Sequence, residues 1–128
     1  MTEQGYQSKI IKAIEGIGGV VVNGTYSKAG IADLICGWPT YYEKVVGQHA
    51  EIVLIHLHIE VKTEKDYERV MRSVCEEKGG LYHFESVTTS LKKHEFLQIT
   101  KLNAVRKLGG KALIAWSIQQ VEDYMNEL

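Results

Sequence analysis

Proline and cysteine are scarce in this sequence of 128 residues, which holds one proline and two cysteines. Two cysteines cannot build a disulfide framework, and Cys36 and Cys75 show no metal-ligand spacing, so we interpret them as buried free thiols in a reducing compartment. Low-complexity tracts are absent, and 45% of the residues are hydrophobic. This composition excludes a disordered chain and predicts one compact domain over residues 1–128.

Long hydrophobic runs are missing as well. The longest apolar-rich stretch, residues 52–59, is interrupted by His56 and His58 and is too short to span a bilayer. Residues 1–10 are polar, unlike a signal peptide. We therefore expect a cytoplasmic protein without a membrane partner.

An excess of charge of one sign is lacking overall, because the net charge is −1. The distribution is uneven, however: residues 89–111 carry six basic side chains against Glu95 alone. Such a run is as typical of a solvated helix face as of a surface that binds phosphate groups. Charge alone thus leaves a nucleic-acid partner open.

The spacing of apolar residues predicts the secondary structure. Helices are expected over residues 6–17, 66–78, 95–108 and 119–128, the first three ending at Gly-Gly pairs. Strands are expected over residues 20–22, 31–38, 52–62 and 111–116. The first of these looks buried, and Pro39 should end the second. Residues 40–50 are read as a polar connection or hairpin end, and residues 81–87 as a strand or an irregular segment. This order predicts an α/β fold with a central mixed β-sheet flanked by α-helices.

The strand over residues 52–62 has one wholly apolar face and one that becomes polar. Because side chains alternate along a strand, Glu60 and Lys62 share the polar face. Asp33 stands on another predicted strand, and if the two are neighbours, Asp33 and Glu60 can bind one divalent ion together with the backbone carbonyl of Val61. Taken alone, however, the pair Glu60 and Lys62 is more typical of a charge pair facing solvent, because this spacing occurs by chance in many proteins.

Three segments together resemble a known family. They are Gly-Ile-Ala-Asp-Leu-Ile at 30–35, His-Ile-Glu-Val-Lys-Thr at 58–63, and Gln98 with Leu102 before the Gly-Gly pair at 109–110. Their order resembles the virus-type replication-repair nuclease (VRR-Nuc) domain, a branch of the PD-(D/E)XK nucleases, over nearly the whole chain. The resemblance implies a restriction-endonuclease-like sheet. The stand-alone phage members of the family are also similar to this chain in size.

The resemblance also implies a role for each matching residue. Asp33 corresponds to the metal-binding aspartate, Glu60 to the second carboxylate, Lys62 to the catalytic lysine and Gln98 to a glutamine beside the active site. The first-helix pair of the family is matched by Glu3, a further candidate metal ligand, and Gln7. Two features depart from the family pattern: Ala32 replaces a proline, and residues 64–94 form an unusually long connection.

From this resemblance we expect a DNA endonuclease that depends on Mg²⁺ or Mn²⁺ and uses no organic cofactor. It would cut branched DNA such as a Holliday junction or a flap, as a homodimer in a bacterial or phage-infected cell. Two alternatives remain: a catalytically inactive DNA- or protein-binding module, and a restriction-type or mismatch endonuclease with the same chemistry.

Several other polar side chains are weaker candidates for DNA contacts. For His58 a plain polar strand face is the favoured interpretation, and for Trp38, Tyr41 and Tyr42 packing on the core is favoured over base stacking. The remaining candidates are Gln7, Lys28, Lys92, Lys93 and Lys101.

Overall fold

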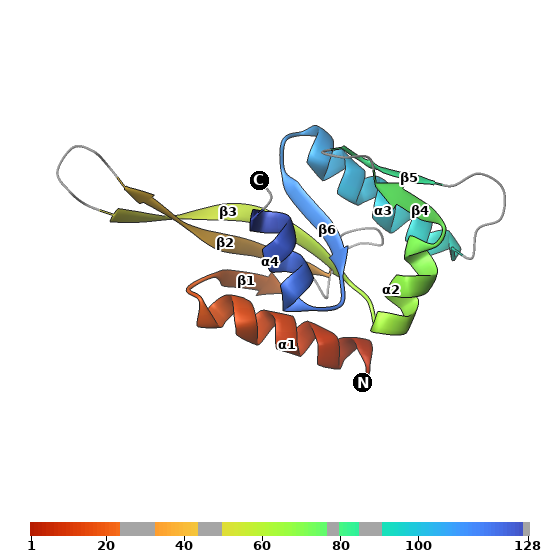
Figure 1. Cartoon of the computed structure of the whole chain (residues 1–128), viewed down its shortest axis with the longest axis horizontal. Helices are drawn as coiled ribbons and strands as arrows, with labels where there is room; N and C mark the ends of the chain where they lie inside the picture. Colours follow the sequence, from red (N-terminus) through yellow and green to blue (C-terminus); the bar gives the residue numbers. More distant parts are fainter. Residues whose placement is uncertain (24–32, 44–49, 77–79, 85–90, 127–128) are drawn as a thin grey trace.

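A computed structural model describes residues 1–23, 33–43, 50–76, 80–84 and 91–126 of the chain (Figure 1). The helices are α1 (Glu3–Gly16), α2 (Glu64–Met71), α3 (Lys93–Lys107) and α4 (Ile118–Asn126). The strands are β1 (Val20–Asn23), β2 (Leu34–Glu43), β3 (Ala50–Val61), β4 (Val74–Glu76), β5 (Tyr82–Phe84) and β6 (Lys111–Ala115). The predicted α/β architecture is confirmed.

The central sheet is mixed and has the strand order β1-β2-β3-β6. The pairs β1/β2 and β2/β3 are antiparallel, whereas β6 runs parallel to β3 with Ile114 opposite Glu60. A parallel pair requires a crossover connection. Here the crossover contains α2, the small β4/β5 sheet and α3, so these elements lie beside β6 (Figure 1).

Two hydrophobic clusters cover opposite faces of this sheet. One joins α1 and α4 to the alternate β3 residues Leu57, Ile59 and Val61, all 0% exposed. The other joins α2, α3 and the small sheet to Ala112 and Ile114 of β6. The apolar face predicted for residues 52–62 is thus confirmed over its second half, where it packs on α1 and α4.

Gly-Gly pairs end α1 and α3 in the same way. Gly18 and Gly109 have φ of +92° and +84°, a conformation that side-chain-bearing residues rarely adopt. The amide of the second glycine then donates to a carbonyl of the last helical turn, Gly19 to Ile14 at 2.9 Å and Gly110 to Val105 at 2.9 Å. These turns direct the chain from helix into strand, as the sequence predicted.

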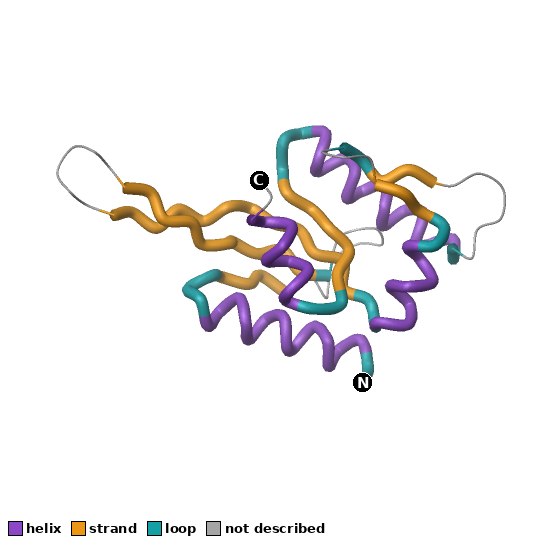
Figure 2. Tube along the Cα trace, in the orientation of Figure 1, coloured by secondary structure: helices purple, strands orange, loops and turns teal. Residues whose placement is uncertain are grey.

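The outer part of the sheet is less covered than the sequence predicted. Figure 2 shows the β2–β3 hairpin extending past the helices. On β3, Val53 and Leu54 are 40% and 45% exposed. The prediction that residues 20–22 form a buried strand is wrong in its burial, because β1 is an edge strand with Val20 and Val22 more than half exposed.

Two other predicted element boundaries are wrong. Strand β2 does not end at Pro39 but continues to Glu43, because β1 pairs only up to Gly37 and a proline needs no partner on an unpaired edge. The helix predicted over 66–78 ends at Met71, because Val74 pairs with Phe84 in the small sheet. The alternating segment 81–87 contains strand β5, with residues 85–90 outside the described ranges.

Of three single-residue expectations, one is confirmed and two are wrong. Both cysteines are free, but only Cys36 is buried, and Cys75 is exposed on the outward side of β4. Leu108, the last residue of the helix predicted over 95–108, follows the last turn of α3 and is 89% exposed. In the part of the chain described, no helix is long and apolar enough to cross a bilayer.

We predict that Leu57→Ala lowers the free energy of unfolding by about 2–5 kcal/mol, because it leaves a cavity between β3 and α1. Leu54→Ala is the matched control, the same change on the same strand at a side chain 45% exposed, and should cost less than about 1 kcal/mol. Urea unfolding followed by circular dichroism measures both. Equal losses in the two variants would show that the part of β3 packed on α1 is no more tightly packed than the outer part of the strand.

Candidate active site

Asp33 and Glu60 come together because β2 and β3 are neighbours. Leu34 pairs with Ile59, so the residue before β2, Asp33, lies across from Glu60. The Oδ2 atom of Asp33 accepts a hydrogen bond from the Val61 amide at 2.9 Å. This bond extends the β2/β3 ladder by one step through a side chain and fixes the Asp33 carboxylate beside β3.

Glu60 is a buried carboxylate with little to neutralise it. The residue is 1% exposed, and within the described structure neither carboxylate oxygen accepts a hydrogen bond. Burial and the neighbouring charge of Asp33 together raise the pKa of Glu60 to about 9, although the Lys62 ammonium acts to lower it. A hydrogen bond between the protonated Glu60 and Asp33 contributes to the rise. Two carboxylates so placed gain stability from a cation between them.

Lys62 is the cation nearest to Glu60 among the described ion pairs. Its Nζ atom lies 3.8 Å from Glu60 Oε1, too far for a hydrogen bond, and donates to Gln98 Oε1 at 2.9 Å. A second carboxylate oxygen, Glu95 Oε2, lies 3.7 Å from the same Nζ. Lys62 is 6% exposed, so its ammonium is held inside the site and does not extend into solvent.

Glu95 and Arg69 were not among the residues predicted from the sequence. The two form a double hydrogen bond, Nη1 to Oε1 and Nη2 to Oε2, each 2.8 Å long. Glu95 Oε1 also accepts from the main-chain amide of Lys92 at 2.7 Å. Although burial acts to raise it, the pKa of Glu95 falls to about 2 because these bonds favour the charged carboxylate. The one sequence signal was the i, i+3 spacing of Glu95 and Gln98, which puts both on one side of α3.

Glu3 belongs to the same neighbourhood. Partial burial raises the pKa of its carboxyl group, and the nearby charge of Asp33 raises it further, whereas Lys62 lowers it. The N-terminal end of α1 therefore faces the end of β3, as Figure 1 also shows. Gln7, one turn later, is half-buried.

The predicted DNA-contact residues divide into two groups. Lys92, Lys93 and Lys101 are exposed on or next to α3, the helix that carries Gln98. His58 instead contacts His56, with Nε2 atoms 3.1 Å apart, and its pKa is lowered by partial burial and by His56. Lys28 and the segment 24–32, with Ala32, lie outside the described residues.

The aromatic candidates do not form a stacking surface in the described part of the site. Trp38 is 8% exposed and packs in the cluster shared with α1 and α4, as favoured from the sequence. The side chains of Tyr41 and Tyr42 lie outside the described structure. Base stacking on Trp38 is therefore dropped from the candidate contacts.

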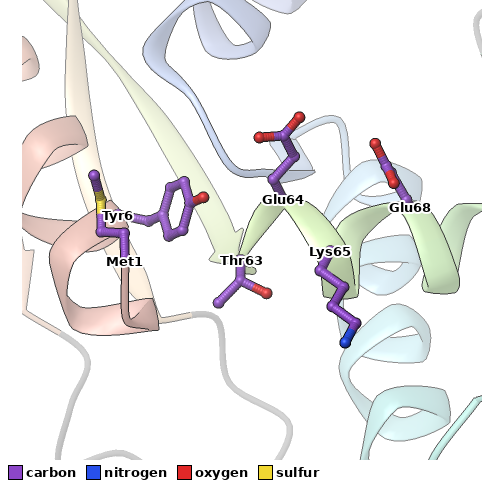
Figure 3. A pocket seen from close by; sticks show the side chains of 6 residues that line it. All are labelled: Met1, Tyr6, Thr63, Glu64, Lys65 and Glu68. Carbon is purple, nitrogen blue, oxygen red and sulfur yellow. The ribbon is translucent and has the colours of Figure 1, made fainter.

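A shallow depression of about 430 Å³ lies beside the site, between the starts of α1 and α2 (Figure 3). Its lining residues are Met1, Tyr6, Thr63, Glu64, Lys65 and Glu68. Thr63 directly follows Lys62 and caps α2 by accepting a hydrogen bond from the Asp66 amide at 3.1 Å. With two carboxylates against one lysine, the depression does not suit a phosphodiester backbone.

Asp33 and Glu60 fit a magnesium-type ion in their chemistry. Among the described residues, no group of three or more His, Cys, Asp or Glu side chains is arranged to hold a metal. Mg²⁺ is commonly bound through one or two carboxylates and keeps several waters, so it does not need such a group. The uncompensated oxygens of Glu60 next to Asp33 are a donor set of that kind.

Comparison of the chain with protein-family models, with curated proteins and with solved structures found no match. The functional argument therefore depends on the site geometry and on the motifs in the sequence.

Proposed function

We propose that the protein is a metal-dependent deoxyribonuclease that hydrolyses internal phosphodiester bonds, with Asp33, Glu60, Lys62 and Gln98 in its active site. The observation that carries this proposal is the buried Glu60 carboxylate, which accepts no hydrogen bond in the described structure and lies beside Asp33. An ionised carboxylate in such a place is costly unless a cation compensates it. The Lys62 ammonium, at 3.8 Å the nearest in the described ranges, does so only in part.

Asp33 and Glu60 would hold Mg²⁺ or Mn²⁺, with the Val61 carbonyl as a further oxygen ligand and Glu3 close enough to position it. A divalent cation there supplies Lewis-acid stabilisation of a phosphate and lowers the pKa of water. The protein contributes a fixed arrangement: Asp33 is anchored to the Val61 amide at 2.9 Å. Anchoring reduces the reorganisation required when the substrate arrives.

Lys62 would stabilise negative charge that develops on the phosphate during attack by water. Its Nζ atom donates one hydrogen bond to Gln98 and has two further protons. A buried ammonium at a fixed position stabilises a developing charge more strongly than one in water. Gln98 accepts this hydrogen bond and so fixes the ammonium near Glu60.

The DNA backbone would be held by the lysines of α3. Lys92, Lys93 and Lys101 are exposed on or next to the helix that provides Gln98, so phosphate contacts there would bring a strand toward the site. Branched DNA as the preferred substrate and a homodimer as the active form are proposed from the family resemblance. A dimer would supply the two active sites that paired cuts require.

We expect Mg²⁺- or Mn²⁺-dependent cleavage of DNA by the wild type, reduced about 10²–10³-fold or more in Asp33→Ala and Lys62→Ala. The assay compares labelled four-way junction, flap and linear duplex, and the best substrate identifies the biological role. Lys65→Ala is the control, because Lys65 is an exposed lysine on α2. Its activity should stay within about twofold of the wild type.

A different result would favour the non-catalytic alternative. If the folded wild type cuts none of these DNAs, and binds them equally with and without metal, the protein is a DNA-binding module and the nuclease proposal fails. Cleavage without any metal, or unaffected by Asp33→Ala, would also contradict it.

We predict that Mn²⁺ raises the thermal unfolding midpoint of the wild type and of Lys62→Ala, but not of Glu60→Gln. Binding to the folded state stabilises it by about 2.7 kcal/mol at a hundred times the dissociation constant. In EDTA, Glu60→Gln should unfold at or above the wild-type midpoint, because glutamine is neutral at the same size, whereas burying Glu60, whose pKa is raised to about 9, requires uptake of a proton. Differential scanning fluorimetry with a Mn²⁺ titration measures both, and an equal Mn²⁺ shift in Glu60→Gln would exclude Glu60 as a ligand.

A further inference from the structure

We propose that Glu95, locked in place by Arg69, is a positioning residue that holds the Lys62 ammonium for catalysis. The inference rests on the proposed nuclease function and adds a part of the site that no sequence motif indicated. Contacts among Arg69, Glu95 and Lys62 join α2 and α3, the two helices of the long crossover, to the end of β3.

Glu95 is the most firmly held carboxylate near the site. It is 2% exposed and accepts three hydrogen bonds of 2.7–2.8 Å, two from the Arg69 guanidinium and one from the Lys92 amide. Paired bonds between arginine and carboxylate fix direction as well as distance. Oε1 accepts two of these bonds and Oε2 one, so Glu95 is poorly suited to bind a metal ion itself.

Lys62 lies between this fixed carboxylate and the proposed ligand Glu60. The distances from Nζ are nearly equal, 3.7 Å to Glu95 Oε2 and 3.8 Å to Glu60 Oε1. Neither is a hydrogen bond, and Gln98 accepts the one short bond at 2.9 Å. The ammonium therefore lies between two carboxyl groups, of which Glu95 is the one held in its charged form, and it donates a hydrogen bond to the neutral Gln98.

The two carboxylates differ in what a metal ion would do to them. The Glu60 carboxylate would bind a cation that it shares with Asp33. That cation would repel the neighbouring Lys62 ammonium. Glu95 would keep its charge facing Lys62, since Arg69 and the Lys92 amide already fix its oxygens. In this arrangement Glu95 is what keeps the Lys62 ammonium in place once the metal site is filled.

A purely structural link between α2 and α3 is the alternative role of this pair. The chain offers a matched control, because Arg106 of α3 pairs with Glu76 of β4. That pair also joins α3 to another element of the crossover, β4, and Glu76 forms no described ion pair with Lys62. Glu95→Gln and Glu76→Gln each remove one arginine-paired carboxylate charge, but only the first should affect Lys62.

The test measures single-turnover cleavage at saturating Mn²⁺ over a range of protein concentrations, which gives both the maximal rate and KM. Glu95→Gln should lower the rate about 10–100-fold with KM changed less than about threefold, because it misplaces a group that acts in the transition state. Glu76→Gln should stay within about twofold of the wild type. In a Lys62→Gln background, Glu95→Gln should cause no further loss, because the group that it positions is gone.

A second readout needs neither metal nor activity. NMR of the lysine ammonium groups in the metal-free protein should show an ordered Lys62 signal in the wild type and in Glu76→Gln, and its loss or shift in Glu95→Gln. If Glu95→Gln does not fold, Arg69→Lys replaces it: that change keeps the charge but loses the paired bonds, and should lower the rate by an intermediate factor.

Three outcomes would overturn the inference. One is an unchanged rate in Glu95→Gln, or in Arg69→Lys where that variant replaces it. The second is an equal further loss in the Lys62→Gln background, and the third is an unaltered Lys62 signal. A wild type that cuts no DNA would instead defeat the proposed function itself, so the two failures are distinguishable.

Discussion

The burial of Glu60 is the constraint on which the site depends. A carboxylate 1% exposed and without a hydrogen bond in the described structure is unfavourable unless charges around it are arranged in compensation. Asp33 intensifies the problem, and Lys62 at 3.8 Å relieves it in part. A protein that needed only stability would gain from an apolar residue there, and this cost is the physical argument for the ion binding that we propose.

The parallel pairing of β3 with β6 explains how the compensating groups reach this place. A parallel pair needs a long connection, and here that connection carries Arg69 on α2 and both Glu95 and Gln98 on α3. Ile114 of β6 lies opposite Glu60, so the cluster that buries α3 also closes the site. Packing and charge placement at the end of β3 therefore come from the same crossover.

The site divides its charges between two tasks. Asp33 and Glu60 place two carboxyl groups side by side, one of them buried, whereas the Glu95 carboxylate is fixed by Arg69 and the Lys92 amide and lies 3.7 Å from the Lys62 ammonium. Lys62 stands between these groups, hydrogen-bonded to Gln98. Active sites commonly contain titratable groups with opposed perturbations, and here burial raises the pKa of Glu60 while hydrogen bonds lower that of Glu95.

The sequence alone determined α1, α3, α4 and the existence of β1, β2, β3 and β6, because period-two and helical spacings record which side faces a core. It also brought Asp33, Glu60, Lys62 and Gln98 to attention through their order. Only the tertiary structure decided what depends on contacts between distant segments. It ended α2 early, left β1 at an exposed edge and placed Arg69 against Glu95, which lie 26 residues apart. The position of a strand in its sheet and the partner in an ion pair are set by such contacts, and a local pattern carries no information about either.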